Sequence, residues 1–214
     1  MRHGPSSESL PVALRHVLAG PLPGLEVQLR MAPRLATGPL PRRADPDMRE
    51  AAALLLLYPY DDAWHVPLTV RGSQLRHHTG QVSMPGGRID DRESVEQAAL
   101  REAYEEVGID PSLVEVVGQL TPLPIVASRH LLHTVVGVAS RRPAFLVAEH
   151  EVERLIEVPL ARLQSPAIIG EERNVERAAD LGPMIVPYFD LGDVRVWGAT
   201  AMVLSEFLEV LRRT

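Results

Sequence analysis

The sequence predicts an α/β fold in which a mixed β-sheet lies between helices. Three observations support this prediction: short β-branched segments fill the centre of the chain, helical spacing occurs before, within and after them, and 45% of the 214 residues are apolar. This apolar content, together with 23% charged residues, is typical of a soluble globular protein. Because a chain of this length can bury a substantial core, we expect one domain over residues 1–214.

The spacing of apolar residues predicts each element in order. A helix is expected over residues 9–19, with Ser9 as a candidate N-cap and Gly20 at its end, and a proline-rich segment follows at 21–46. Residues 1–48 are expected to pack on the body of the domain. Strands at 51–58 and 65–71, joined by a turn at 61–63, should form a hairpin. Further strands are expected at 114–120, 134–139, 184–188 and 194–197, and further helices at 94–107, 149–156 and 199–212.

Two residue types are absent. The chain has no cysteine, and all 22 of its basic residues are arginine. Without cysteine, disulfides, thiolate nucleophiles and cysteine-ligated metal sites are excluded. Without lysine, P-loop nucleotide sites, protein kinase sites, pyridoxal phosphate enzymes and Schiff-base aldolases are excluded, because each of them needs an amine.

The net charge of −6 argues against a general nucleic-acid or anionic-membrane surface. Residues 1–5 lack the apolar core of a secretory signal, and the longest apolar run, residues 51–58, is far shorter than a bilayer span. We therefore expect a cytoplasmic protein that binds a small molecule and binds neither nucleic acid nor membrane. A homodimer is compatible with the sequence.

The stretch that begins at Gly86 carries the most informative pattern. Gly86 and Gly87 predict a tight loop in which the backbone approaches a ligand closely. Asp90 and Asp91 are candidate N-caps for the helix expected at 94–107, whose composition of Ala, Glu, Leu and Gln favours helix formation.

This helix, which Gly108 should end in a left-handed conformation, carries three carboxylates on one face. Glu102, Glu105 and Glu106 are related by i+3 and i+4 spacing, so they lie within about one turn of each other. Like charges at this spacing repel, and the C-terminal end of a helix also disfavours anions. A hard divalent cation compensates such a cluster, because Mg²⁺ takes carboxylate oxygens and keeps positions for water and substrate phosphates. A solvated acidic face is the alternative.

The spacing of the whole stretch decides between these interpretations. Gly87, five residues, Glu93, seven residues and then REAYEEVGI at 101–109 match all seven fully specified positions of the Nudix box. The chain therefore resembles the Nudix hydrolases, which cleave diphosphate linkages in nucleoside diphosphate derivatives. The resemblance implies an α/β/α sandwich in which the box forms a loop, a helix and a second loop.

The resemblance also implies roles for the box residues. Three carboxylates and one backbone carbonyl are candidate ligands of Mg²⁺ or Mn²⁺: Glu102, Glu105, Glu106 and Gly86. Glu93 should pair with Arg101 and brace the loop. The catalytic base is left open between Glu102 and a loop acid, for which Glu149 and Glu151 are the candidates.

A second motif, just upstream, resembles the coenzyme A diphosphatase branch of this family. The sequence PLTVRGSQLRHHTGQVSMPGG at 67–87 keeps Arg71, Arg76, Gly80 and Pro85 in register with the motif of this branch, and it departs at Pro67, Gly72 and Met84. VWGATA at 196–201 also looks like this branch. Coenzyme A carries a diphosphate and a 3′-phosphate, which arginine binds well by bidentate contact. The candidate substrate-binding residues are Arg71, Arg76, His77 or its neighbour His78, and Gly87.

The expected reaction is metal-dependent hydrolysis of coenzyme A or its derivatives to 4′-phosphopantetheine and adenosine 3′,5′-bisphosphate. Two alternatives stay open. One is another Nudix specificity such as ADP-ribose, because Pro124 lies 15 residues past Ile109, as in the ADP-ribose diphosphatase pattern. The other is a non-catalytic Nudix-fold nucleotide sensor, although such proteins usually lose the box glutamates that this chain keeps.

Overall fold

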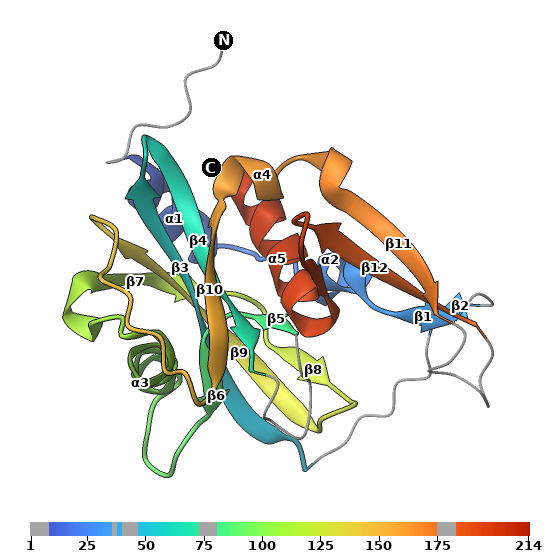
Figure 1. The fold of residues 1–214 in the computed structure, drawn as a ribbon, viewed down its shortest axis with the longest axis horizontal. Coiled ribbons are helices and arrows are strands. Elements are labelled where there is room, and N and C mark those ends of the chain that lie inside the picture. The colour runs from blue at the N-terminus through green and yellow to red at the C-terminus, as the bar shows by residue number, and fades with distance from the viewer. Residues whose placement is uncertain (1–8, 36–37, 40–46, 73–80, 175–182) are drawn as a thin grey trace.

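The computed structural model describes residues 9–35, 38–39, 47–72, 81–174 and 183–214. A mixed sheet forms its centre, and the five main strands are ordered β10 (Val152–Pro159), β4 (Ala63–Arg71), β3 (Arg49–Tyr60), β9 (His130–Ala139) and β7 (Val114–Gln119). The helix α3 (Val95–Val107) covers one face of this sheet, and α5 (Gly198–Leu211) and α1 (Ser9–Leu18) cover the other (Figure 1). The predicted α/β fold with a mixed sheet between helices is confirmed.

The long strand β3 organises the sheet. It runs parallel to β9, and it forms an antiparallel hairpin with β4 through a turn in which Asp61 and Asp62 adopt positive φ angles. Both the hairpin and its turn were predicted, and two left-handed residues suit the twist of a tight hairpin. Three short strands extend the sheet: β5 (Val82–Ser83) pairs with β4, β6 (Gly86–Arg88) with β3, and β8 (Leu123–Ile125) with β9.

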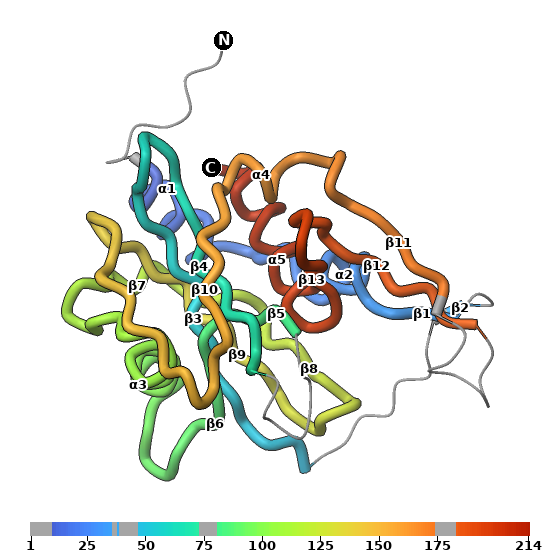
Figure 2. Tube along the Cα trace, in the orientation of Figure 1, coloured from blue at the N-terminus to red at the C-terminus, as the bar shows by residue number. Residues whose placement is uncertain are grey.

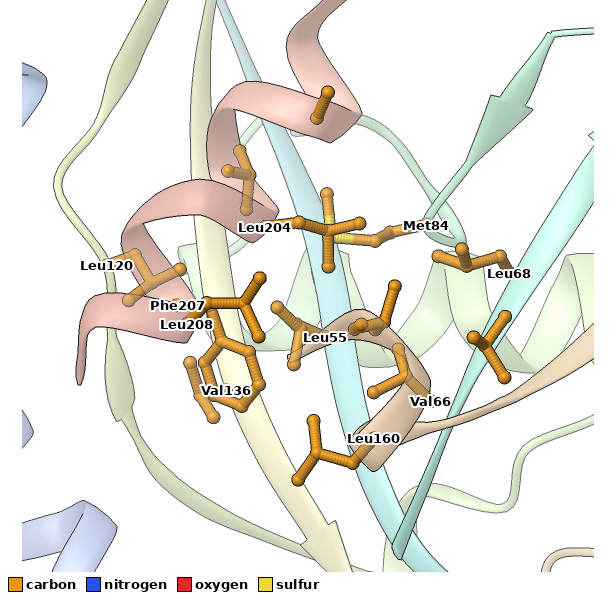
Figure 3. Packing of buried hydrophobic residues seen from close by; sticks show 14 of the residues in the cluster. Leu55, Val66, Leu68, Met84, Leu120, Val136, Leu160, Leu204, Phe207 and Leu208 are labelled. Atoms are coloured by element: carbon orange, nitrogen blue, oxygen red, sulfur yellow. The ribbon is translucent and has the colours of Figure 1, made fainter. Parts of the chain in front are cut away.

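Alternate residues of β3 supply two separate cores, because successive side chains of a strand point to opposite faces. Ala52, Leu54, Leu56 and Tyr58 pack toward α3, whereas Leu55 and its odd-numbered neighbours pack toward α5. Figure 3 shows this second core, in which side chains of α5 lie over side chains of β3 and β9; the labelled residues are Leu204, Phe207 and Leu208 of α5, Leu55 of β3 and Val136 of β9. Burial on both faces explains why every residue from 51 to 58 is apolar.

The N-terminal segment packs on the body, as far as it is described. Leu10, Leu14 and Leu18 of α1 are buried in the α5-side core. The following helices, α2 (Leu25–Gln28) and the 3-10 helix at Leu29–Met31, lie against α5, whose fully buried Glu206 accepts hydrogen bonds from three donors. These donors are the Gly24 amide (2.9 Å), the Gln28 side chain (2.6 Å) and the Thr121 hydroxyl (2.6 Å).

A second, smaller sheet lies beside α5 (Figures 1 and 2). It contains β11 (Ile169–Asn174), β12 (Met184–Asp190), β13 (Arg195–Trp197) and the short strands β1 (Arg34–Leu35) and β2 (Gly38–Pro39). The short helix α4 (Leu160–Leu163) connects β10 to this sheet through a 3-10 turn. No described helix is long and apolar enough to cross a membrane.

The prediction of a helix at 149–156 is wrong. Residues 149–151 form a turn, and the rest belongs to the strand β10, which pairs with β4 along most of its length. Val152, Leu155 and Ile156 have helical spacing, but a short apolar run of this kind fits a strand equally well. Cross-strand pairing and the proline that ends β10 decide in favour of the strand.

Candidate active site

The two glycines of β6 bring its backbone against both β3 and α3. Gly86 and Gly87 pair with Ala53 and Ala52, so the expected loop is a short strand. A Cβ atom at Gly86 would lie 2.5 Å from the Ala52 carbonyl oxygen, and one at Gly87 would overlap the carboxylate of Glu102. Both positions therefore need glycine because of a close approach, by the β3 backbone in one case and by a box carboxylate in the other.

The hydrogen-bond register of β6 directs the Gly86 backbone toward α3. The Leu54 amide donates to the Pro85 carbonyl (2.9 Å), which makes the next pair, Ala53 with Gly86, a non-hydrogen-bonded position. The N–H and C=O groups of Gly86 consequently both face away from β3. The N–H donates to the carboxylate of Glu106, so the carbonyl lies along the same edge.

Both ends of α3 are fixed by local signals. Ser94 is the N-cap and forms a capping box: its hydroxyl accepts from the Gln97 amide (3.1 Å) and its own amide donates to the Gln97 side chain (2.9 Å). Asp90 and Asp91, the predicted caps, instead lie before Ser94 where the chain turns into the helix. Gly108 ends the helix with a φ of 71°, as predicted.

Arg101 joins four groups around the box. Two of its nitrogens donate to the two carboxylate oxygens of Glu93 (2.9 and 3.0 Å), and Nη1 donates to Glu102 (2.8 Å) and Glu105 (3.0 Å). Nη2 also donates to the Arg88 carbonyl (3.0 Å), which ties α3 to β6. The expected pair of Glu93 and Arg101 is present, and its hydrogen bonds hold the pKa of Glu93 below the ordinary value.

Glu106 is the buried carboxylate of the cluster, with 8% of its surface exposed. None of the ion pairs among the described residues includes it. Burial, followed by the charges of Glu102 and Glu151, raises its pKa to about 8, although Arg71 and the Gly86 backbone oppose the rise. Glu106 therefore needs a cation nearby to be fully ionised at neutral pH.

The turn before β10 brings a further acid to this cluster. The Ala148 amide donates to the carbonyl of Glu106 (2.9 Å), which ties the turn to the end of α3. Burial is the main cause of the raised pKa of Glu102, and the charge of Glu151 contributes. Glu149, the other expected loop acid, is exposed in the same turn and is not among the main groups that shift the pKa of Glu102 or Glu106.

A protein-family model matches the part of the chain that contains this site. The NUDIX domain model matches residues 48–178, which include β6, α3 and the turn before β10. The chain belongs to the Nudix family.

Named relatives agree with this assignment. Nudix hydrolase 15, mitochondrial, of Arabidopsis thaliana is 36% identical over 178 residues, which are 77% of this chain and 60% of that protein. The uncharacterized Nudix hydrolase NudL of Escherichia coli is 38% identical over 142 residues, which are 65% of this chain and 71% of that protein. The chain spans 60% and 53% of the lengths of two matched plant Nudix hydrolases. None of these names specifies a substrate.

Solved Nudix structures share the fold. The Nudix hydrolase RenU from M. smegmatis has a TM-score of 0.52 and 20% identity, over 84% of this chain and 92% of that chain. The MutT protein from Methanosarcina mazei Go1 has a TM-score of 0.51 and 14% identity, over 80% of this chain and all of the other. The predicted Nudix fold and family are therefore confirmed.

The substrate residues predicted for this Nudix domain fall in two groups. Arg71 is exposed at the end of β4, near enough to Glu106 for its charge to lower the pKa of that carboxyl. Arg76 and His77, with His78, lie outside the described residues.

Two threonines that were not among the candidates hold the strand that leads into the Nudix box. The Thr69 hydroxyl of β4 donates to the Ser83 carbonyl (3.2 Å), and the buried Thr200 hydroxyl of α5 donates to the Val82 carbonyl (3.0 Å). The strand β5 is thereby fixed between β4 and α5. Both threonines stand inside the motifs at 67–87 and 196–201, which is the signal that could have found them.

The Nudix box fits a divalent cation in charge and burial. In their present rotamers, no three His, Asp or Glu side chains of the described residues are grouped around one point. Glu102 and Glu105 face Arg101, and Glu106 faces Gly86. A buried carboxylate whose pKa is raised by neighbouring carboxylates nevertheless lacks positive charge, and a hard cation supplies it through oxygen ligands.

We expect the metal-free protein to lose stability as the pH rises from 4.5 to about 8, the ordinary and folded-state pKa values of Glu106. In this window the folded carboxyl keeps a proton that the unfolded chain releases, so the folded state binds more protons and a rise in pH favours unfolding. The loss should be of the order of a few kcal/mol, because one pKa unit corresponds to about 1.4 kcal/mol.

Urea unfolding in EDTA at pH 5 and pH 8.5 measures this loss. Glu106→Gln should remove most of the difference between the two pH values, because an amide does not titrate. An equal pH dependence in the variant would show that Glu106 is not the responsible group.

Proposed function

We propose that this Nudix domain hydrolyses the diphosphate bond of coenzyme A or its derivatives, with 4′-phosphopantetheine and adenosine 3′,5′-bisphosphate as the products. The observation that carries the proposal is the proximity of Arg71 to Glu106. Arg71 belongs to the upstream motif that resembles the coenzyme A diphosphatase branch, and Glu106 belongs to the box. A diphosphate held by Arg71 would thus lie beside the box carboxylates.

In this proposal some box residues bind the metal ion, and Arg101 keeps the metal-binding carboxylates in position. Glu102, Glu105 and Glu106, with the Gly86 carbonyl, would hold Mg²⁺ or Mn²⁺. When bound, such a cation polarises the diphosphate and neutralises the charge that builds up during hydrolysis. Arg101 keeps Glu102 and Glu105 in position through its hydrogen bonds to both.

Arg71 and a carboxylate complete the reaction. The guanidinium of Arg71 binds non-bridging phosphate oxygens and orients the phosphorus atom toward the attacking water. The water oxygen bonds to phosphorus, the bridging P–O bond breaks, and its electron pair leaves with the departing phosphate. A carboxylate accepts the proton of the water, and Glu151 and Glu102 are the candidates because both lie in the cluster.

Glu151→Gln should lower kcat about 100-fold, because general base catalysis typically contributes 10²–10⁴-fold. Glu149→Gln is the matched control, since Glu149 lies two residues away in the same turn and is exposed. Steady-state rates of both variants, measured with saturating Mg²⁺, test the assignment. Equal kcat values for Glu151→Gln and the unaltered protein would leave Glu102 as the base.

A substrate panel tests the proposed function. Coenzyme A, ADP-ribose and diadenosine polyphosphates are each incubated with Mg²⁺, with Mn²⁺ and with EDTA, and the products are separated by chromatography. We expect the highest kcat/KM for coenzyme A and no turnover in EDTA. Brisk cleavage of ADP-ribose with negligible cleavage of coenzyme A would overturn the substrate assignment, and nucleotide binding without any turnover would identify a sensor.

A further inference from the structure

A positively charged patch lies next to the box, at the edge of the central sheet. Three residues form it: Arg49 at the start of β3, His130 at the start of β9 and Arg88 at the end of β6. The parallel register pairs Arg49 with His130, and the antiparallel register pairs Arg88 with Ala51, two residues along β3 from Arg49. Paired residues and residues two apart on a strand share one face, so all three point to the α5 side of the sheet.

The neighbouring acid of this edge points to the other face. Glu50 follows Arg49 on β3, and its carboxylate lies 2.5 Å from the imidazole of His133 on the α3 side. Arg49 and Arg88 are both exposed, and the ion pairs among the described residues include neither. Partial burial and then the charges of Arg88 and Arg49 lower the pKa of His130, which agrees with three groups close together.

The patch has a fixed position relative to the box. Arg88 stands two residues beyond Gly86, which corresponds to about 7 Å of extended strand. The hydrogen bond from Arg101 to the Arg88 carbonyl fixes this end of β6. The 5′- and 3′-phosphates of adenosine 3′,5′-bisphosphate are separated by a single ribose, a reach of similar length. A substrate with its diphosphate at the box can therefore place a 3′-phosphate at the patch.

We propose that Arg49, Arg88 and His130 form a binding site for the 3′-phosphate of the substrate's adenosine group. The proposal rests on the proposed coenzyme A diphosphatase function. Two guanidinium groups without carboxylate partners among the described residues suit a dianionic phosphate, which takes paired N–H donors. Because ADP-ribose and diadenosine polyphosphates lack a 3′-phosphate, the patch would select coenzyme A among the candidate substrates.

The first test compares coenzyme A with 3′-dephospho-coenzyme A as substrates of the 214-residue chain with Mg²⁺. We expect kcat/KM to be roughly 10- to 100-fold higher for coenzyme A, as charged hydrogen bonds of this kind predict. Arg49→Gln and Arg88→Gln should each reduce this ratio, and the double variant should bring it close to one. Arg141→Gln is the matched control, because Arg141 is exposed beyond the opposite end of β9, and it should keep the ratio.

The second test is independent of turnover. Calorimetry in EDTA measures the affinities of adenosine 3′,5′-bisphosphate and 5′-AMP for the unaltered protein and for the double variant. We expect the unaltered protein to bind the bisphosphate more tightly than 5′-AMP. The double variant should bind the two nucleotides with equal affinity. Equal affinities in the unaltered protein, or an unchanged preference in the double variant, would overturn the 3′-phosphate site. A protein that prefers the bisphosphate yet cleaves no coenzyme A would contradict the proposed function and leave this site standing.

Discussion

Glu106→Gln is expected to reduce kcat for diphosphate hydrolysis by more than about 100-fold, because even outer-shell partners of metal ligands contribute 10–100-fold. Glu106 is the buried carboxylate of the box and accepts a hydrogen bond from the Gly86 backbone. The amide has nearly the same shape but no charge for a cation. The same substitution should raise the stability of the metal-free protein at pH 8, since it removes a buried ionisable group.

This pair of opposite effects separates a functional loss from misfolding. Activity and the urea midpoint in EDTA are measured on the same preparation. Glu96→Gln is the control, because Glu96 is exposed in the first turn of the same helix, and it should change neither quantity. Full activity in Glu106→Gln would remove this residue from the site.

Arg101→Ala should lower both activity and stability. The guanidinium makes five hydrogen bonds, to three carboxylates and to the Arg88 carbonyl. Its loss leaves Glu93, Glu102 and Glu105 without their shared cation and releases β6 from α3. We expect kcat to fall about 100-fold, in the range that outer-shell partners of metal ligands contribute, and the melting temperature to fall by several degrees.

Lysine should not rescue this variant, because an ammonium group cannot reproduce the planar, two-bond contact with Glu93. Arg142→Ala is the matched control. Arg142 makes a comparable two-bond pair with Glu157 (2.7 Å for both bonds), near the hairpin end of β3 and away from β6. Arg142→Ala should reduce the stability of the protein and leave kcat unchanged. Equal kcat values for Arg101→Ala and the unaltered protein would contradict the role of Arg101.

The sequence was most predictive where the signals are local. The helix α3 has its C-terminal stop at Gly108, and its glutamates keep the spacing of the box. The hairpin of β3 and β4 needs only apolar strands and a turn of two aspartates. The pair of Glu93 and Arg101 could be expected from the family pattern, and its geometry adds Glu102, Glu105 and the Arg88 carbonyl to the same guanidinium.

Non-local pairing accounts for what could not be predicted. The segment at Gly86 is extended because β3 lies beside it, and β10 is a strand because β4 offers it a partner. The burial that distinguishes Glu106 from the exposed Glu105 depends on the Gly86 edge and on the turn before β10, which are remote from α3 in the chain. The sequence alone could not identify the N-cap of α3, because Asp90, Asp91 and Ser94 are all residue types that favour this position.

The central claim is that the buried Glu106 and its neighbouring carboxylates hold a divalent cation. Titration of Mn²⁺ into the protein, with free Mn²⁺ followed by electron paramagnetic resonance, tests it without any substrate. We predict saturable binding at pH 8 that weakens at least tenfold in Glu106→Gln, a typical lower bound for loss of a site partner, and that is unchanged in Glu96→Gln. Equal Mn²⁺ affinity in Glu106→Gln and the unaltered protein would contradict the account.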